Sequence, residues 1–412
     1  MGINEKSARI LSPEILALSW IAIMLPASAA EWSIEPSVTA ATNYSDNFRL
    51  LDESRLVQPI QSNIEFSVSP ALQFGHETEV RNVKGKLRIA ANRFNNDKAL
   101  NSNDAFFDIN WVEKGERSEF RLLSNNSFDS TLATLLQDVG NATEDRRQRL
   151  RVSVNPTYAY NLDARLALAL GYRYEDVGFR DARNTVLVDY RSNELLPSLR
   201  YKFDERNELE VNTRLWQLIT VPDNLSISRS TFKSGFLSAT YNQTIDESSS
   251  WSAGVGYYSI DENTTGNTNS TLERKTTYSG PTAIAKYMWR NEYGNASVTA
   301  AREINPSGEN TLLRTTRVGA DLSRGISTYV TAGISSSAFK NDVIGGAIEK
   351  SSKYFRVSPS LSWKPARNWN IDGGVVYQRT QTTSNVAANT KADAKSVYLN
   401  FIYVWDKTAV SR

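Results

Sequence analysis

The chain alternates between apolar and polar residues from about residue 32 to residue 405, and this alternation is its dominant pattern. Two clear runs are residues 64–74 (IEFSVSPALQF) and residues 397–405 (VYLNFIYVW). A period of two residues predicts β-strands that have one apolar face and one polar face. Most runs have about 9 to 13 residues, which is the length that a tilted strand needs to cross a bilayer. The pattern therefore predicts an all-β protein whose strands cross a membrane.

About eighteen such strands follow one another along the chain. The connections alternate between short turns, such as residues 161–164 and 204–208, and longer polar segments, such as residues 125–145 and 259–273. Short periplasmic turns and long outer loops are typical of an antiparallel up-and-down β-barrel in the bacterial outer membrane. An even number of strands puts both ends of the chain on the periplasmic side. The strands are predicted to start near residues 32, 62, 80, 103, 118, 147, 165, 188, 209, 231, 250, 275, 295, 311, 327, 352, 369 and 394.

The tryptophans help to separate a membrane barrel from a water-soluble all-β fold, which would also show alternation. Amphipathic rings favour the membrane interface, so a belt of them at one rim is expected of a barrel. Trp216 is the one tryptophan of the predicted strands that falls outside such a belt. Those that flank short turns are Trp111, Trp251, Trp289, Trp363 and Trp369.

Six prolines fall inside the predicted strands. Proline lacks the N–H that a strand donates to its neighbour, so within sheets it marks an edge or a bulge. A closed barrel has no edge, and we therefore expect a bulge at each of these positions. They are Pro36, Pro70, Pro156, Pro197, Pro281 and Pro359.

The first thirty residues differ in character from the rest. Lys6 and Arg9 precede an apolar run at residues 15–25, which is followed by Pro26 and the small residues 27–30. This order predicts a secretory signal peptide, and the run is too short to be comfortable as an uncleaved membrane anchor. Residues 31–412 contain no linker and no shift in composition. We expect them to form a single outer-membrane β-barrel domain of a Gram-negative bacterium.

The composition excludes several kinds of functional site. The chain has no cysteine, one histidine (His76) and a formal net charge of +2. Disulfides and thiolate metal sites are therefore excluded, and a near-neutral chain has no bulk attraction to nucleic acid. No cluster of histidines offers metal ligands, and His76 falls in a predicted turn away from any nucleophile. We expect a protein that is not an enzyme and that holds no metal or cofactor.

Reversing the alternation gives the residues that face the lumen, and in the first half of the chain these include many cations. One interpretation is a mixed lining in which cations and carboxylates pair within a water-filled pore. The other is an electropositive track that favours an anionic solute, because rings of arginine and lysine select anions. The predicted basic track consists of Lys84, Lys86, Arg88, Arg121, Arg149, Arg151, Arg173, Arg200, Lys202 and Arg214.

Residues 129–140 (DSTLATLLQDVG) depart from the strand pattern. Their apolar residues are spaced at i, i+3, i+4 and i+7, which predicts a short helix in a long outer loop. Such a helix folds into the lumen as a constriction, or it packs on the rim or on neighbouring loops. The residues of this candidate constriction are Leu132, Leu135, Leu136 and Val139.

The predicted first strand and the turn after it carry two short motifs. They are residues 31–38 (EWSIEPSV) and residues 43–47 (NYSDN). They resemble the W-x-I-x-P strand and the T-Y-x-D-N turn of outer-membrane β-barrels associated with exosortase (PEP-CTERM) and exopolysaccharide loci, with Asn43 where threonine is usual. The resemblance implies a role linked to the export of cell-surface polysaccharide. One departure is that residues 406–412 extend beyond Trp405, the last aromatic residue of the last strand.

Two functions remain open from the sequence. The first is an outer-membrane channel for exopolysaccharide or small anionic solutes, which the basic track favours. The second is a structural or docking barrel of a cell-surface secretion system, plugged by its own loops, which the long outer loops favour. The expected partners are outer-membrane lipid, polysaccharide or a small anion, and proteins of a secretion complex, but no nucleic acid.

Overall fold

The computed structural model describes residues 32–55, 60–131, 147–180, 187–222, 228–265, 273–345, 349–385 and 388–410. The predicted signal peptide lies outside these residues. Two single-turn 3-10 helices, η2 (Glu53–Arg55) and η3 (Lys98–Leu100), lie between long strands. In the described part of the chain no helix is long and apolar enough to cross a membrane.

The strands are β1 (Trp32–Ser45), β2 (Asn63–Glu77), β3 (Arg81–Phe94), β4 (Ser102–Lys114), β5 (Ser118–Ser130), β6 (Gln148–Asn161), β7 (Leu166–Phe179), β8 (Asp189–Lys202), β9 (Asn207–Val221), β10 (Arg229–Thr244), β11 (Ser249–Thr265), β12 (Glu273–Asn291), β13 (Gly294–Pro306), β14 (Leu312–Gly325), β15 (Val330–Ile344), β16 (Lys350–Ala366), β17 (Trp369–Ser384), β18 (Thr390–Val404) and the two-residue β19 (Thr408–Ala409).

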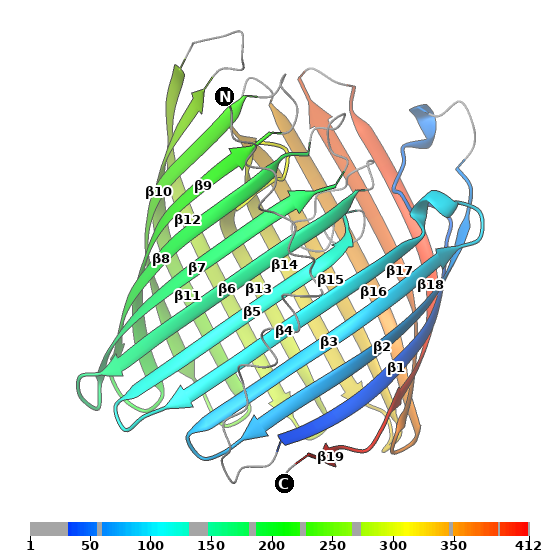
Figure 1. Cartoon of the computed structure of the whole chain (residues 1–412), viewed down its shortest axis with the longest axis horizontal. Coiled ribbons are helices and arrows are strands. Elements are labelled where there is room, and N and C mark those ends of the chain that lie inside the picture. The colour runs from blue at the N-terminus through cyan, green and yellow to red at the C-terminus, as the bar shows by residue number, and fades with distance from the viewer. Residues whose placement is uncertain are drawn as a thin grey trace, which may run out of the picture.

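The long strands form a closed antiparallel barrel, which confirms the predicted fold. Each strand pairs with the next along the chain, and β1 also pairs with β18, from Ser37 opposite Val404 to Ser45 opposite Ser396. Figure 1 shows the tilted strands wrapping around one interior. The short β19 extends the sheet against Ser33 and Ile34 of β1. Every predicted strand start lies within four residues of an observed one.

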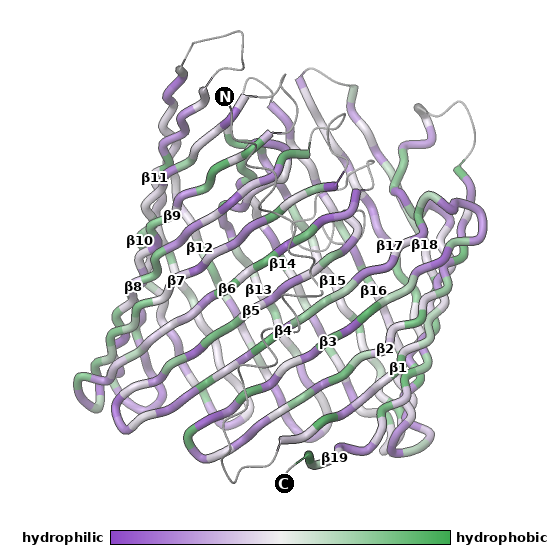
Figure 2. The backbone as a smooth tube through the Cα atoms, in the orientation of Figure 1, coloured by the Kyte–Doolittle hydropathy of each residue, from purple (hydrophilic) through white to green (hydrophobic). Residues whose placement is uncertain are grey.

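The outer face of the wall is apolar because alternate residues of each strand point outward. Its large apolar side chains are well exposed, for example Val255 (71%), Leu237 (59%) and Leu361 (55%). Figure 2 shows the hydropathy alternating along the strands. On most strands the apolar outward positions span about ten residues, which at a tilt of about 45° cover roughly 23 Å of height. This height matches the apolar band of about 25 Å on a membrane-spanning barrel.

The short turns are held by side chains that accept backbone N–H groups. Asp163, Asp204 and Asp246 each use one carboxylate oxygen to accept from the second and third residues that follow. Hydrogen bonds from Ser248 and Ser249 lower the pKa of Asp246 to about 2. Such Asx turns reverse the chain tightly, which accounts for the short connections at this end of the barrel.

Five of the six prolines do not produce the predicted bulges. The ladder skips Pro70 between β2 and β3, but the pairs on either side, at Val68 and Ala71, keep the same register. The ladder skips Pro156, Pro197 and Pro359 in the same way, and it is continuous through Pro36 and Pro281. A missing donor therefore removes ladder bonds locally without adding a residue. The described pairings change register between Trp363 and Ala366 of β16 and also beside Pro36, where β1 passes from Ser37 opposite Val404 of β18 to Ile34 opposite Thr408 of β19.

Candidate functional site

The ten residues of the predicted basic track lie on strands β3 to β9, at positions that alternate with the outward apolar residues. Arg149 and Arg151, for example, alternate with Leu150, which is 42% exposed on the outer face. Lys84, Lys86 and Arg88 come from β3, Arg121 from β5, Arg149 and Arg151 from β6, Arg173 from β7, Arg200 and Lys202 from β8, and Arg214 from β9.

Half of these cations are paired with carboxylates from the same strand or a neighbouring one. The most buried pair is Arg149 with Asp129: two guanidinium nitrogens each donate to a different carboxylate oxygen at 3.0 Å, and the residues are 4% and 2% exposed. The track is therefore a mixed lining over much of its length. The other pairs are Arg121–Glu119 (2.9 Å), Arg151–Glu175 (2.9 Å), Arg173–Glu194 (3.4 Å) and Arg200–Glu208 (3.5 Å).

The β3 cations form the part of the track with the fewest acidic neighbours. Lys84, Lys86 and Arg88 occupy successive inward positions, and the β2 residues opposite them are uncharged. Arg88 lies over the ring of Phe106 at 4.0 Å, while Asp108 is the carboxylate opposite Lys86. No ion pair joins any of these three cations to a described residue. They place unneutralised positive charge on the lumen wall.

The β13–β14 hairpin separates from β12 and leans over the lumen, while β14 stays paired with β15. β12 and β13 pair only from Asn291 opposite Gly294 up to Ala283 opposite Arg302, whereas β13 and β14 stay paired to Pro306 opposite Leu312. Beyond Arg302 the hairpin therefore has no pairing with β12.

The tip of this hairpin binds the opposite side of the mouth. The backbone N–H of Val188, just before β8, donates to the carbonyl of Gly308 at 2.8 Å. The Asn310 amide donates to the carbonyl of Ser228 at 2.9 Å, and Lys350 pairs with Glu309 at 3.2 Å. These contacts join the hairpin tip to residues at the ends of β8, β10 and β16, so the hairpin lies across part of the mouth of the lumen.

An apolar cluster fixes the hairpin against the lumen face of β9 to β11. Ile304 and Leu312 of the hairpin are 3% and 0% exposed. The indole N–H of Trp216 donates to the Ser192 hydroxyl at 2.7 Å, so Trp216 belongs to this interior contact and not to a membrane belt. Full burial of a leucine or isoleucine side chain, as at Leu312 and Ile304, stabilises the docked position of the hairpin by about 1.5–3 kcal/mol. The cluster consists of Trp216, Leu218, Phe232, Tyr258, Ile260, Ile304, Leu312 and Ile344.

A cavity of about 290 Å³ remains between the hairpin and the wall. One of its four arginines, Arg214, lies 3.7 Å from the ring centre of Phe236 and 5.2 Å from that of Trp216. Arg214 also lines a second cavity of about 430 Å³, so it lies between the two. The side of the first cavity away from the hairpin carries Arg149, Arg151, Arg173, Glu175, Tyr190, Ser192 and Glu194.

The hairpin was not anticipated from the sequence, although two signals were present. Trp216 departs from the tryptophan belt, and Leu312 and Leu313 are adjacent apolar residues that are both buried. Adjacent apolar residues on a strand point to opposite faces, which requires cover on both sides. The constriction predicted at Leu132, Leu135, Leu136 and Val139 lies outside the described residues.

His76 belongs to the wall. Its ring packs against Trp32 with centroids 4.9 Å apart, and the residue is 5% exposed. Among the described residues, no group of three or more histidine, aspartate or glutamate side chains is arranged to hold a metal ion.

Comparison with known proteins gives structural matches only. No protein-family model matches the sequence, and no curated protein matches it. Matching solved structures include OpdQ of Pseudomonas aeruginosa (12% identity, 92% of this chain and 99% of that one, TM-score 0.42) and OccAB4 of Acinetobacter baumannii (10%, 91% and 98%, 0.46). The FrpB iron transporter of Neisseria meningitidis also matches (8%, 92% and 83%, 0.47). The barrel assignment therefore stands on the strand pairing of this chain.

Proposed function

We propose that the protein is a non-enzymatic channel of the Gram-negative outer membrane that passes anionic solutes, with both termini in the periplasm. The observation that carries the proposal is the β3 ladder of Lys84, Lys86 and Arg88, whose positive charge has no ion-pair partner among the described residues. Positive rings in a pore raise the local concentration of anions and lower the barrier to their passage.

The solute class that we propose includes acidic polysaccharide. The motif at residues 31–38 resembles barrels from exopolysaccharide loci. Arg214, stacked on Phe236, offers a guanidinium to the lumen beside the hairpin. Carboxylates of an acidic polysaccharide bind guanidinium groups through paired hydrogen bonds.

The test is the reversal potential of single channels in planar bilayers under a KCl gradient. The K84Q/K86Q variant removes two exposed lumen charges without breaking a described ion pair. Anion preference is expected to fall about two-fold or more. Arg149→Gln is unsuitable here because it would disturb the buried contact with Asp129.

The matched control is K233Q/K275Q, which removes two exposed charges from the outer face of the barrel, one on β10 and one on β12. It should leave selectivity unchanged. Equal anion preference in K84Q/K86Q and the unaltered protein would contradict the anion-channel proposal.

A second function is supported by the hairpin, whose hydrogen bonds and apolar cluster hold it across the lumen. The barrel would then be a plugged docking element of a cell-surface secretion system. This alternative predicts negligible conductance after insertion has been verified, together with a specific partner in crosslinking experiments on intact cells. Open, anion-preferring channels without such a partner would exclude it.

A further inference from the structure

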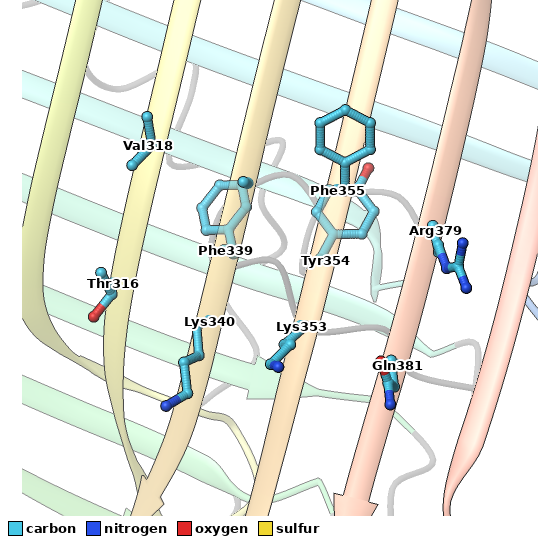
Figure 3. Close-up of a pocket in the computed structure, with 10 residues that line it drawn as sticks. Thr316, Val318, Phe339, Lys340, Lys353, Tyr354, Phe355, Arg379 and Gln381 are labelled. Carbon is cyan, nitrogen blue, oxygen red and sulfur yellow. The ribbon is translucent and has the colours of Figure 1, made fainter.

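The outer face of β14 to β17 carries a groove at the upper edge of the apolar belt. The groove has a volume of about 380 Å³ and is shown in Figure 3. Along β16 the outward residues are apolar as far as Phe355, and the next outward residue is Lys353. The groove therefore lies at the level where apolar side chains give way to charged ones, at the end of the barrel with the long connections.

Cations from neighbouring strands converge on this groove. Lys340 of β15 is directly opposite Lys353 of β16 in the ladder, and Gln381 follows on β17. Figure 3 shows these three side chains on adjacent strands. Directly opposite residues have Cβ atoms about 5 Å apart, and like charges in that position are destabilising unless an anion lies between them. Arg379, 44% exposed, adds a third cation one row closer to the belt.

The local carboxylates do not neutralise the groove. Asp342 lies 3.5 Å from both Lys340 and Arg314, and it also accepts from the Ser351 hydroxyl at 2.9 Å. Asp393 lies 3.6 Å from Arg379. Four cations, counting Lys353, therefore face two carboxylates, and no ion pair joins Lys353 to a described residue.

An apolar floor adjoins the cations on the membrane side. Val318, Ala338 and Phe355 form one row across β14 to β16, with Arg379 opposite Phe355 on β17. Val318 is 50% exposed and Phe355 is 42% exposed. A ligand that fits this surface carries an anionic head and an apolar tail in the direction of the bilayer.

We propose that the groove binds a phosphorylated lipid of the outer leaflet. Its phosphate lies between Lys340 and Lys353, within reach of Arg379, and its acyl chains lie along Val318 and Phe355. A phosphate accepts several charge-assisted hydrogen bonds at once and separates the two facing ammonium groups. This proposal rests on the proposed outer-membrane location but not on channel activity.

The test uses the full-length barrel in detergent with EDTA, so that bridging divalent cations do not contribute. Native mass spectrometry measures the binding of bisphosphorylated lipid A and of the same lipid after removal of its phosphates. The unaltered protein should bind the phosphorylated lipid at least ten-fold more tightly. K340Q/K353Q should weaken that binding by about thirty-fold, because two basic residues near an anionic lipid headgroup contribute about 2 kcal/mol together and about 1.4 kcal/mol corresponds to ten-fold.

Controls separate this site from general charge effects. K233Q/K275Q removes equal charge from another part of the outer face, on β10 and β12, and should bind as the unaltered protein does. K340R/K353R should keep the binding, and heat-modifiable migration in gels verifies that each variant is folded. Equal binding of the two lipids, or equal loss in both glutamine variants, would overturn the proposal. Because the readout is lipid binding, a failure here is distinguishable from a failure of channel activity.

Discussion

Release of the β13–β14 hairpin should widen the mouth of the barrel. Eighteen strands about 4.8 Å apart and tilted by about 45° enclose a circle of radius ~19 Å. Wall side chains reduce this by about 5 Å, half the spacing of packed sheets. The hairpin adds a layer about 10 Å thick and so occupies about a third of the remaining cross-section. Its removal should raise single-channel conductance by about 1.5-fold.

The perturbation is I304A/L312A. These residues are 3% and 0% exposed within the cluster, and each truncation of a buried aliphatic side chain to alanine costs about 2–5 kcal/mol. A combined loss of about 4 kcal/mol shifts the docked–undocked equilibrium by close to a thousand-fold, since about 1.4 kcal/mol corresponds to ten-fold. The pairing between β12 and β13 below Ala283 is untouched, so the barrel should still migrate as a folded species.

The assay is single-channel recording beside limited proteolysis of the hairpin tip. The control, L215A/L237A, truncates two apolar residues that are 51% and 59% exposed on the outer face, and it should change neither conductance nor cleavage. If I304A/L312A becomes cleavable at the tip while its conductance stays the same, the hairpin does not constrict the pore. If it stays protected, the cluster does not hold the hairpin.

Three further outcomes follow from the geometry. Arg149→Gln should destabilise the barrel by about 3–5 kcal/mol in urea unfolding, because it removes the cation that binds both carboxylate oxygens of buried Asp129. Adding Asp129→Asn should restore much of the loss. An unchanged urea midpoint in the single variant would contradict this prediction. The pKa of the Asp246 carboxyl should be about 2, so its contribution to turn stability is present above its ordinary pKa of 3.8 and is lost as the pH falls through about 2. Ser248→Ala should raise the pKa of Asp246 measured by an NMR titration, because it removes a hydrogen bond to the carboxylate. An unchanged pKa in this variant would count against the turn hydrogen bond. Gly308→Val should loosen the hairpin tip, because Gly308 has φ +76° and a Cβ there would lie 3.3 Å from the Phe179 ring; greater proteolysis of the tip checks this, and unchanged protection would refute it.

The basic track shows which features of the lumen the alternation of residues can predict. The residues that face inward follow from a period of two, which is a local property of the strand. Whether Arg149 is a free cation or half of a buried pair depends on what stands opposite it. That partner, Asp129, is set by the register between β5 and β6. Register joins residues twenty positions apart, and nothing in a single strand encodes it.

The prolines also show that the effect of a residue depends on its neighbours in the structure. The missing N–H of Pro70 is a fact of the sequence, but its consequence depends on the neighbours. The flanking pairs at Val68 and Ala71 hold the register, and the wall absorbs the loss without a bulge. A cooperative ladder on both sides of the strand overrides a local preference.

Local patterns in the sequence specify the fold class of this protein. A repeated period of two, strands of membrane-crossing length and alternating short and long connections are local signals, and together they specify a closed wall with an apolar exterior. What occupies the interior depends instead on contacts between strands that are distant in the sequence. The β13–β14 hairpin has the same strand pattern as its neighbours up to Arg302, and it separates from β12 because Ile304 and Leu312 meet an apolar surface contributed by β9 to β11. That contact joins segments that lie more than forty residues apart in the sequence, and it exists only once the barrel has closed around them.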